Sequence, residues 1–188
     1  DMDEEKNRVA VIGKPNVGKS SLINRILGEE RMIVTNIAGT TRDAIDSYVT
    51  RNNKEYIFVD TAGLRKRGKI NESLERYSVI RTLRAIDNAD ICLLLIDASE
   101  GVTEQDSKIL GYAHDNGKAC GILVNKWDLI EKDNSTVKTF EQQIRKELGF
   151  AQYAPILFIS AKTGQRIDKI FLMLEEIYEN YNARIATN

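Results

Sequence analysis

Four polar segments, each placed directly after a short apolar run, constrain the fold of this chain more than any other feature. Their letters are GKPNVGKS at 13–20, DTAG at 60–63, NKWD at 125–128 and SAK at 160–162. Short apolar runs that alternate with amphipathic stretches are typical of a mostly parallel sheet covered by helices. In such sheets ligands bind beyond the carboxyl ends of the strands. We therefore expect the four segments to converge on one pocket.

The spacing of apolar residues predicts the α/β fold class: a mostly parallel six-stranded sheet with one antiparallel edge strand and helices on both faces. A polar stretch at 44–50 and the run at 55–60 form the expected hairpin around Asn52 and Asn53, residues that favour turns. The other strands are expected at 8–13, 90–97, 118–124 and 155–160, and the helices at 19–27, 103–116, 136–148 and in a last stretch that carries Ile167 and Tyr178.

Length and composition narrow the class of protein. The 188 residues suffice for one globular domain. Charged residues make up 29% and nearly cancel to a net charge of -1, so no overall basic field favours nucleic acid. Cys92 and Cys120 lie in apolar runs, which predicts buried free thiols. With no run of membrane-spanning length and no signal-peptide pattern, we expect a cytoplasmic location.

The first segment has the phosphate-loop pattern GxxxxGK followed by Ser, between a predicted strand and a predicted helix. Gly13 and Gly18 let backbone N–H groups turn inward around a β-phosphate. Lys19 is expected to bridge the β- and γ-phosphates, and the hydroxyl of Ser20 to bind Mg²⁺. The residues expected around the phosphates are Gly13, Lys14, Pro15, Asn16, Val17, Gly18, Lys19, Ser20 and Ser21.

The second segment follows the apolar residues 56–59. Asp60 is expected to hold Mg²⁺ through water, and the backbone N–H of Gly63 to contact the γ-phosphate. A plain turn at the end of a strand is the alternative reading of these residues.

The third and fourth segments predict a guanine pocket. The Asp128 carboxylate can accept hydrogen bonds from guanine N1–H and the N2 amine, which adenine does not offer. Ser160, Ala161 and Lys162 close this pocket, and Asn125 and Lys126 belong to it. GTP and GDP are thus the expected substrate and product.

Several stretches carry a resemblance to a known family. They are KPNVGKSS at 14–21, NIAGTTRD at 36–43, DTAGLRK at 60–66 and GYAH at 111–114. With them the chain resembles translation-factor-class GTPases of the Era and tRNA-modifying branch, which share the Ras-like G-domain fold. It is most similar to the second GTPase domain of the tandem-domain Der (EngA) family.

The resemblance implies a larger parent protein. Residues 1–7 would be an acidic linker remnant, 8–182 the GTPase domain and 183–188 a tail leading to a missing domain. The family has a neighbouring GTPase domain and a KH-like domain, and it assists assembly of the large ribosomal subunit. That subunit or its rRNA is thus an expected partner of the parent protein. From the family we also take Lys126 as covering the base and the Ala161 N–H as contacting guanine O6.

The resemblance also implies the catalytic groups. Leu64 stands where Ras-like enzymes carry a water-orienting glutamine, and relatives with this change use a potassium ion instead. Asn16 and the carbonyls of Thr35 and Ile37 would then hold K⁺. We favour Thr41 over Thr40 as a ligand of Mg²⁺ and of the γ-phosphate. Glu75, or else Glu72, is the candidate that positions water, although both could be plain exposed helix acids.

A basic stretch follows the second segment and suggests a contact with RNA. It comprises Arg65, Lys66, Arg67, Lys69, Arg76, Arg81 and Arg84. A GTP-dependent contact with an RNA backbone is one interpretation, and a solvated charged face is the other. Two further functions stay open at this point: the G domain of a tRNA-modifying GTPase, and a nucleotide-binding scaffold with low turnover.

Overall fold

The computed structural model describes residues 7–28, 33–34, 45–67 and 78–187. Its strands are β1 (Arg8–Ile12), β2 (Ile33–Val34), β3 (Ser47–Arg51), β4 (Lys54–Phe58), β5 (Ile91–Asp97), β6 (Ala119–Asn125) and β7 (Ile156–Phe158). Its helices are α1 (Lys19–Gly28), α2 (Thr61–Arg67), α3 (Ser78–Asp87), α4 (Glu104–Asp115), α5 (Thr136–Glu147) and α6 (Lys169–Thr187), with 3-10 turns η3 (Trp127–Leu129) and η4 (Gly149–Ala151).

The strands form one mixed sheet in the order β2-β3-β4-β1-β5-β6-β7. Strand β3 runs antiparallel to both β2 and β4, whereas the pairs from β4 through β7 are parallel. The predicted α/β class is confirmed, and all six predicted strands are present. The two-residue β2 is a seventh strand, so the antiparallel β3 lies one place in from the edge. Two residues carry no detectable periodicity, which is why the sequence does not indicate β2.

The predicted hairpin joins β3 to β4. Asn52 and Asn53 have φ of 51° and 64°, the left-handed values that a tight two-residue hairpin turn requires. Asparagine tolerates this conformation better than most residues.

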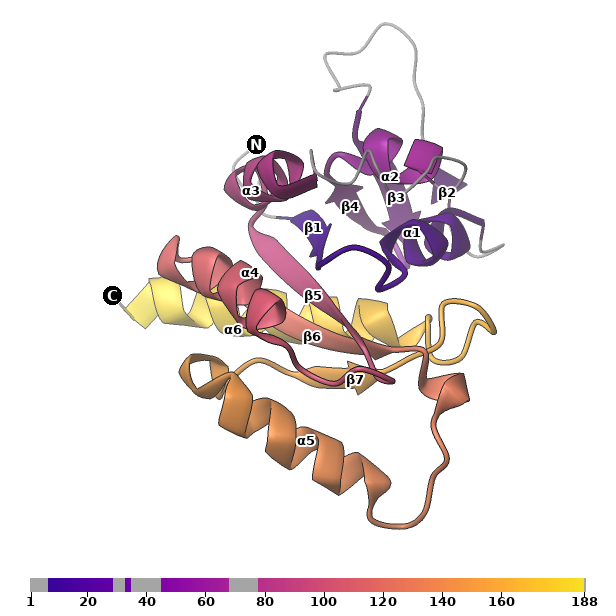
Figure 1. The fold of residues 1–188 in the computed structure, drawn as a ribbon. Helices are drawn as coiled ribbons and strands as arrows, with labels where there is room; N and C mark the ends of the chain where they lie inside the picture. Colours follow the sequence, from indigo (N-terminus) through magenta and orange to yellow (C-terminus); the bar gives the residue numbers. More distant parts are fainter. Residues whose placement is uncertain (1–6, 29–32, 35–44, 68–77, 188) are drawn as a thin grey trace, which may run out of the picture.

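Helices cover both faces of the sheet (Figure 1). Side chains of α1 and α6 pack on one face, and those of α3, α4 and α5 pack on the other. In the figure α6 passes behind β5 and β6, while α4 lies on their near side. Every residue of β5 is buried, as expected for a central parallel strand covered on both faces. The sheet therefore gives the loops at its ends a rigid base.

A glycine in β6 brings α6 close to the sheet. A methyl group at Gly121 would lie 2.9 Å from Ile177 Cδ1 and 3.0 Å from both Leu93 Cδ2 and Met173 Sδ. Only a residue without a side chain fits this contact between helix and strand.

Two helices differ from the sequence-based expectation. The sequence predicts no helix after Asp60, but α2 begins there at Thr61 and includes Gly63. Glycine disfavours helix interiors, so local propensity gives no sign of α2. Helix α6 continues to Thr187, so most of the segment expected to be a tail is helical.

Cys92 and Cys120 are buried, free and opposite each other on β5 and β6, as their apolar surroundings predict. Burial raises the pKa of both thiols, that of Cys120 to about 12. In the described parts of the chain, no helix combines the length and the apolar character needed to cross a membrane.

Candidate functional site

The four polar segments meet at one edge of the sheet. Strands β4, β1, β6 and β7 are mutually parallel members of it, and each segment begins at or just beyond the carboxyl end of one of them. The structure thus brings together loops that lie more than a hundred residues apart in the sequence. This is the edge at which open α/β sheets bind ligands.

The loop between β1 and α1 winds tightly at its carboxyl end. Gly18 has φ of 104°, and a side chain there would collide with the amide of Asn125. Val17 is buried, whereas Asn16 is exposed and has φ of 68°. The Nζ of Lys19 donates to two carbonyls of this loop, those of Gly13 at 2.5 Å and Lys14 at 2.9 Å. The ammonium group therefore lies against the loop, at the positive end of α1.

A buried amide connects three of the loops. Asn125, the last residue of β6, is 3% exposed. Its Nδ2 donates to the carbonyl of Val17 at 2.8 Å, and its Oδ1 accepts from the N–H of Ala161 at 2.9 Å. One side chain thus holds the phosphate loop and the loop after β7 against the end of β6.

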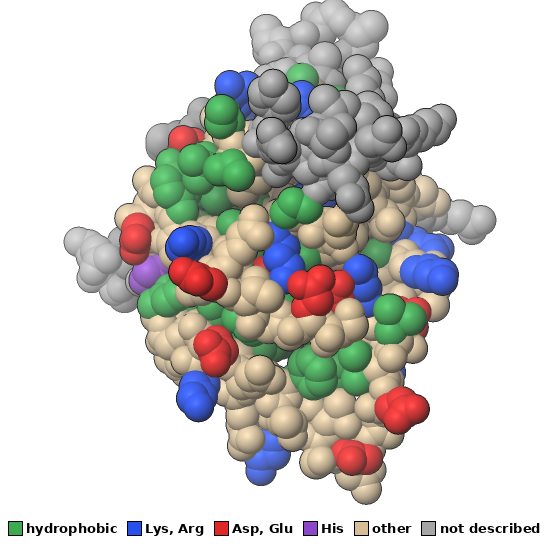
Figure 2. All heavy atoms as spheres, in the orientation of Figure 1, with side chains coloured by type: hydrophobic (Ala, Val, Ile, Leu, Met, Phe, Trp, Pro, Cys, Tyr) green, Lys and Arg blue, Asp and Glu red, His purple; other side chains and the backbone are tan. Residues whose placement is uncertain are grey.

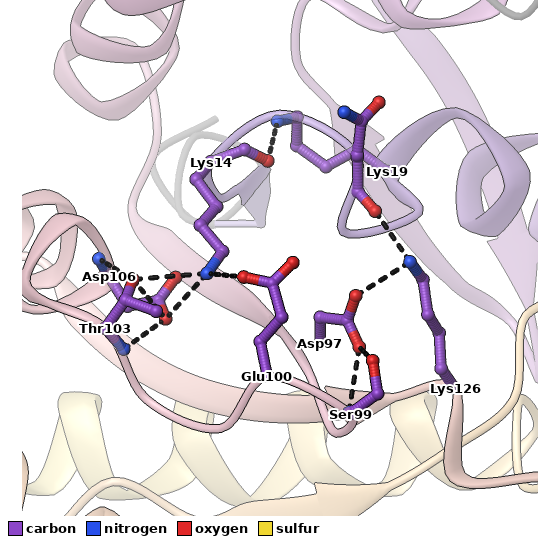
Figure 3. Close-up of polar contacts among 9 residues, drawn as sticks. Lys14, Lys19, Asp97, Ser99, Glu100, Thr103, Asp106 and Lys126 are labelled. Atoms are coloured by element: carbon purple, nitrogen blue, oxygen red, sulfur yellow. Dashed lines mark hydrogen bonds and ion pairs between the residues drawn. The ribbon is translucent and has the colours of Figure 1, made fainter. Parts of the chain in front are cut away.

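Lys126 reinforces this connection. Its φ is 64°, and its Nζ donates to the carbonyl of Asn16 at 2.8 Å. The same Nζ donates to Asp97 Oδ2, also at 2.8 Å (Figure 3). Burial alone would raise the pKa of Asp97, but hydrogen bonds from Lys126 and Ser99 outweigh it and hold the pKa below its usual range. Asp97 is therefore ionised at neutral pH and fixes the stem of Lys126 beside the loop.

Ser160 orients the carboxylate of Asp128. The buried Ser160 hydroxyl donates to Asp128 Oδ1 at 2.8 Å and accepts from the N–H of Thr163 at 3.1 Å. Asp128 itself is exposed. Between Lys126 and Asp128, the indole of Trp127 is buried and packs 4.5 Å from the ring of Phe158, centroid to centroid. This packing fixes the turn that presents Asp128.

The segment after β4 reaches the same edge. Asp60 has φ of 52°, and the next residues open α2. Arg81 of α3 lies so close to Gly63 that a side chain there would collide with its guanidinium group. The Ser20 hydroxyl donates to the carbonyl of Leu64 at 2.5 Å. Helix α2 is thereby held against α1.

A hollow of about 340 Å³, counted with its part open to solvent, lies beside this segment. Lys19, Asp60 and Gly63 all line it, together with Leu64 and Arg81. The three groups expected around a terminal phosphate are therefore neighbours in space.

Several predicted residues lie outside the described residues. They are Thr35, Ile37, Thr40, Thr41, Glu72 and Glu75, together with Lys69 and Arg76 of the basic stretch.

Arg25 of α1 helps to hold the loop after β7, a role that the sequence does not indicate. It donates through Nε to the carbonyl of Ala161 at 3.1 Å and through Nη2 to that of Lys162. The two segments are 136 residues apart, and no local pattern in the sequence signals such a contact. Arg25 and Asn125 thus hold the loop after β7 from two sides.

The sheet order, the phosphate loop and the converging loops define a phosphate-loop nucleotide-binding domain. A family model described as the 50S ribosome-binding GTPase matches residues 8–126. The GTPase Der of Finegoldia magna is 63% identical over 185 residues, and that of Caldanaerobacter subterraneus is 61% identical over 185 residues. Each match covers 98% of this chain.

A solved structure of Era with MgGDPNP and a piece of 16S ribosomal RNA is 31% identical. It superposes with a TM-score of 0.67 and covers 91% of this chain and 56% of the Era chain. The chain belongs to the family of 50S ribosome-binding GTPases, which confirms the resemblance to Der. It spans 42% of the length of the two Der proteins.

Replacing Asn125 with Ala tests the amide connection. It leaves a buried carbonyl and a buried N–H without partners, which cost about 1–3 kcal/mol each. We therefore expect the free energy of unfolding, measured by urea denaturation, to fall by about 2–4 kcal/mol. The exposed Asn134→Ala is the control and is expected to be neutral. An Asn125→Ala variant as stable as the control would contradict the role given to this amide.

Proposed function

We propose that this domain binds GTP at the edge formed by the four loops and hydrolyses it to GDP and phosphate. The observation that carries the proposal is the hydrogen bonding of Asn125 to both the phosphate loop and the loop after β7. Because of it, a segment suited to phosphate and segments suited to a base form one site. Membership in a GTPase family supports the same reaction.

Backbone N–H groups and a lysine ammonium group would bind the phosphates of the nucleotide. The loop at 13–18 offers N–H groups at the amino end of α1, where the helix dipole favours anions. Lys19 adds a positive charge, and Gly63 allows the backbone to approach closely. Phosphoryl transfer depends mainly on such positioning and charge stabilisation.

The residues present fit Mg²⁺. Ser20 and Asp60 supply the oxygen donors that this ion prefers, and Thr41 is proposed as a third ligand. Within the described residues there is no group of three or more His, Cys, Asp and Glu side chains that could hold a metal by themselves. The phosphates of the nucleotide would therefore complete the ligand set. Bound Mg²⁺ would neutralise charge on the β- and γ-phosphates.

The base end of the site would select guanine. Ser160 holds one oxygen of Asp128, and this hydrogen bond would aim the carboxylate at the N1–H and amine edge of the base. Lys126 lies beside the phosphate loop, where its stem can cover the base. The Ala161 N–H, which donates to Asn125 Oδ1, is proposed to share this hydrogen bond with guanine O6. Adenine has a lone pair at N1 and no amine at C2, so it would offer this carboxylate no donor of its own.

An Asp128→Asn substitution tests this assignment. The new amide can donate to the C2 carbonyl of xanthine, so we expect the preference to shift from GDP to XDP by at least about tenfold. Competition of both nucleotides against fluorescent GDP measures the shift. The exposed Asp115→Asn serves as the control and should keep the guanine preference. An unchanged preference in Asp128→Asn would refute the pocket.

Hydrolysis is proposed to be stimulated by potassium. Leu64 has no group that can orient water, and it packs partly buried against the core. Asn16 is exposed on the phosphate loop, where its amide oxygen suits a large monovalent cation. Thr35 and Ile37 are the other proposed ligands. A bound K⁺ would add positive charge near the β–γ bridge. Thr41 and Glu75 are proposed to act on the γ-phosphate and the attacking water.

Turnover in potassium and in sodium tests this proposal. At matched ionic strength we expect phosphate release to be at least about tenfold faster in potassium chloride, because a charge stabiliser of the transition state is added. An Asn16→Ala variant is expected to lose the difference. Equal rates in both salts would contradict the potassium site, and no turnover in either would favour a nucleotide-binding scaffold.

The larger protein is proposed to act in assembly of the large ribosomal subunit. The chain spans 42% of the length of its Der relatives, so other domains would complete this task. Arg65 of α2 and Arg81 and Arg84 of α3 are exposed and belong to the proposed RNA contact. On the face drawn in Figure 2, acidic and basic side chains are interspersed, so such a contact would be local. The buried free thiols support the proposed cytoplasmic location.

Co-sedimentation tests the proposed partner. We expect the full-length protein to pellet with isolated large ribosomal subunits more strongly with a GTP analogue than with GDP. The control is Lys19→Ala, which should lose the nucleotide dependence. Failure to pellet in either state would contradict the ribosomal partner, and retention of tRNA instead would favour a tRNA-modifying GTPase.

A further inference from the structure

The side chain of Lys14 points away from the predicted phosphate site. Although Lys14 belongs to the phosphate loop, its side chain is only 8% exposed. Figure 3 shows it reaching toward the segment between β5 and α4. There its Nζ donates to Glu100 Oε2 at 2.7 Å and to Thr103 Oγ1 at 3.2 Å. The side chain therefore binds protein groups.

A buried carboxylate lies behind these contacts. Asp106, in the first turn of α4, is fully buried, and its Oδ2 is 3.8 Å from Lys14 Nζ. That oxygen accepts hydrogen bonds from Thr103, from N–H at 2.8 Å and from Oγ1 at 3.0 Å. Its other oxygen, Oδ1, has no hydrogen-bond partner among the described residues. Burial raises the pKa of Asp106, whereas the hydrogen bonds from Thr103 and the nearby Lys14 ammonium oppose this shift. Lys14 is therefore the counter-charge of this buried carboxyl group.

The first turn of α4 also has anchors besides Lys14. Thr103 and Asp106 form a reciprocal capping box, and Leu110 and Ala113 anchor the helix in the core. The phosphate loop, by contrast, is held by side chains from other parts of the chain. Its later residues are held by Lys126 at Asn16 and by Asn125 at Val17. Lys14 supplies a corresponding anchor for the earlier residues.

The main chain of Lys14 connects this anchor to the predicted reactive groups. Its carbonyl accepts from Lys19 Nζ at 2.9 Å. A shift of Lys14 would therefore move both the path of the loop and a contact of the Lys19 ammonium.

We propose that Lys14 is a positioning residue, clamped by Glu100 and Asp106, through which the start of α4 holds the phosphate loop in its binding conformation. The inference rests on the proposed binding of guanine nucleotide at this loop. Loosening the clamp lets the loop sample conformations in which its N–H groups no longer converge. Affinity for the nucleotide then falls, although no contact with the nucleotide has been removed.

The test is a double-mutant cycle on nucleotide affinity. Lys14→Met removes the hydrogen bonds and the ion pair of the ammonium group, and Asp106→Asn removes its buried counter-charge. Each is expected to raise the Kd for fluorescent GDP about tenfold. The double variant is expected to bind no worse than the weaker single variant, because both act through one contact. Lys14→Arg, which keeps the charge, should retain most of the affinity.

One control and one further variant separate this positioning role from a merely structural one. Lys108→Met removes an exposed lysine of the same helix that pairs with Glu104 at 3.4 Å, and its Kd should not change. Glu100→Gln weakens the clamp at a half-exposed side chain without altering the core, and it should raise the Kd about threefold. Thermal unfolding of each variant reports stability separately.

Thermal stability and Kd together distinguish a positioning role of Lys14 from a purely structural one. If the variants lose thermal stability and keep the Kd of the wild type, Lys14 only stabilises the fold and the inference is overturned. Additive losses in the double variant would overturn it as well. If the wild type itself does not bind fluorescent GDP, the proposed function fails before the inference is tested.

Discussion

The hydrogen bonds of the buried Asn125 amide are the constraint on which the rest of the site depends. An amide carries a donor and an acceptor, so it can serve the carbonyl of Val17 and the N–H of Ala161 together. An aspartate would offer only acceptors at neutral pH and would leave the carbonyl unpaired. Gly18 must be a glycine for the same reason, because any side chain there would occupy the place of the amide.

The other features of the site build on this connection. With the end of β6 fixed, the next residues alternate between the site and the core. Lys126 lies beside the phosphate loop, Trp127 is buried, and Asp128 is exposed and accepts a hydrogen bond from Ser160. Arg25 and Asp97 then add charged hydrogen bonds at the periphery. Protein contacts already order the four described loops, so these loops would lose little conformational freedom on binding a nucleotide.

The sequence predicts those parts of the molecule that have local signals. Periodicity indicates the central strands, and the Asn52-Asn53 pair indicates the hairpin, because each reflects the conformational preference of a few neighbouring residues. The four segments are recognisable because nucleotide chemistry requires particular residue types at fixed spacing. Strand β2 is too short for a pattern, and α2 contains a glycine in its first turn, so neither is evident.

The supporting contacts could not be predicted, and the reason is physical. Arg25, Asp97 and Asp106 act through partners that are far away in the sequence, and their roles follow from the way strands and helices pack. Lys14 is instructive, because its place in the motif suggests a phosphate contact whereas the folded chain turns its side chain toward α4. Whether a charged side chain meets a ligand or a protein group is decided by tertiary structure.

The proposed function depends on four distant loops that form a single pocket for a guanine nucleotide. Competition of unlabelled GDP and ADP against fluorescent GDP on the wild-type chain tests it most directly. GDP should displace the probe at concentrations at least about a thousandfold lower than ADP, because adenine offers the Asp128 carboxylate no hydrogen-bond donor. Equal displacement by the two nucleotides would contradict the pocket, and with it the account of how Asn125 joins the loops.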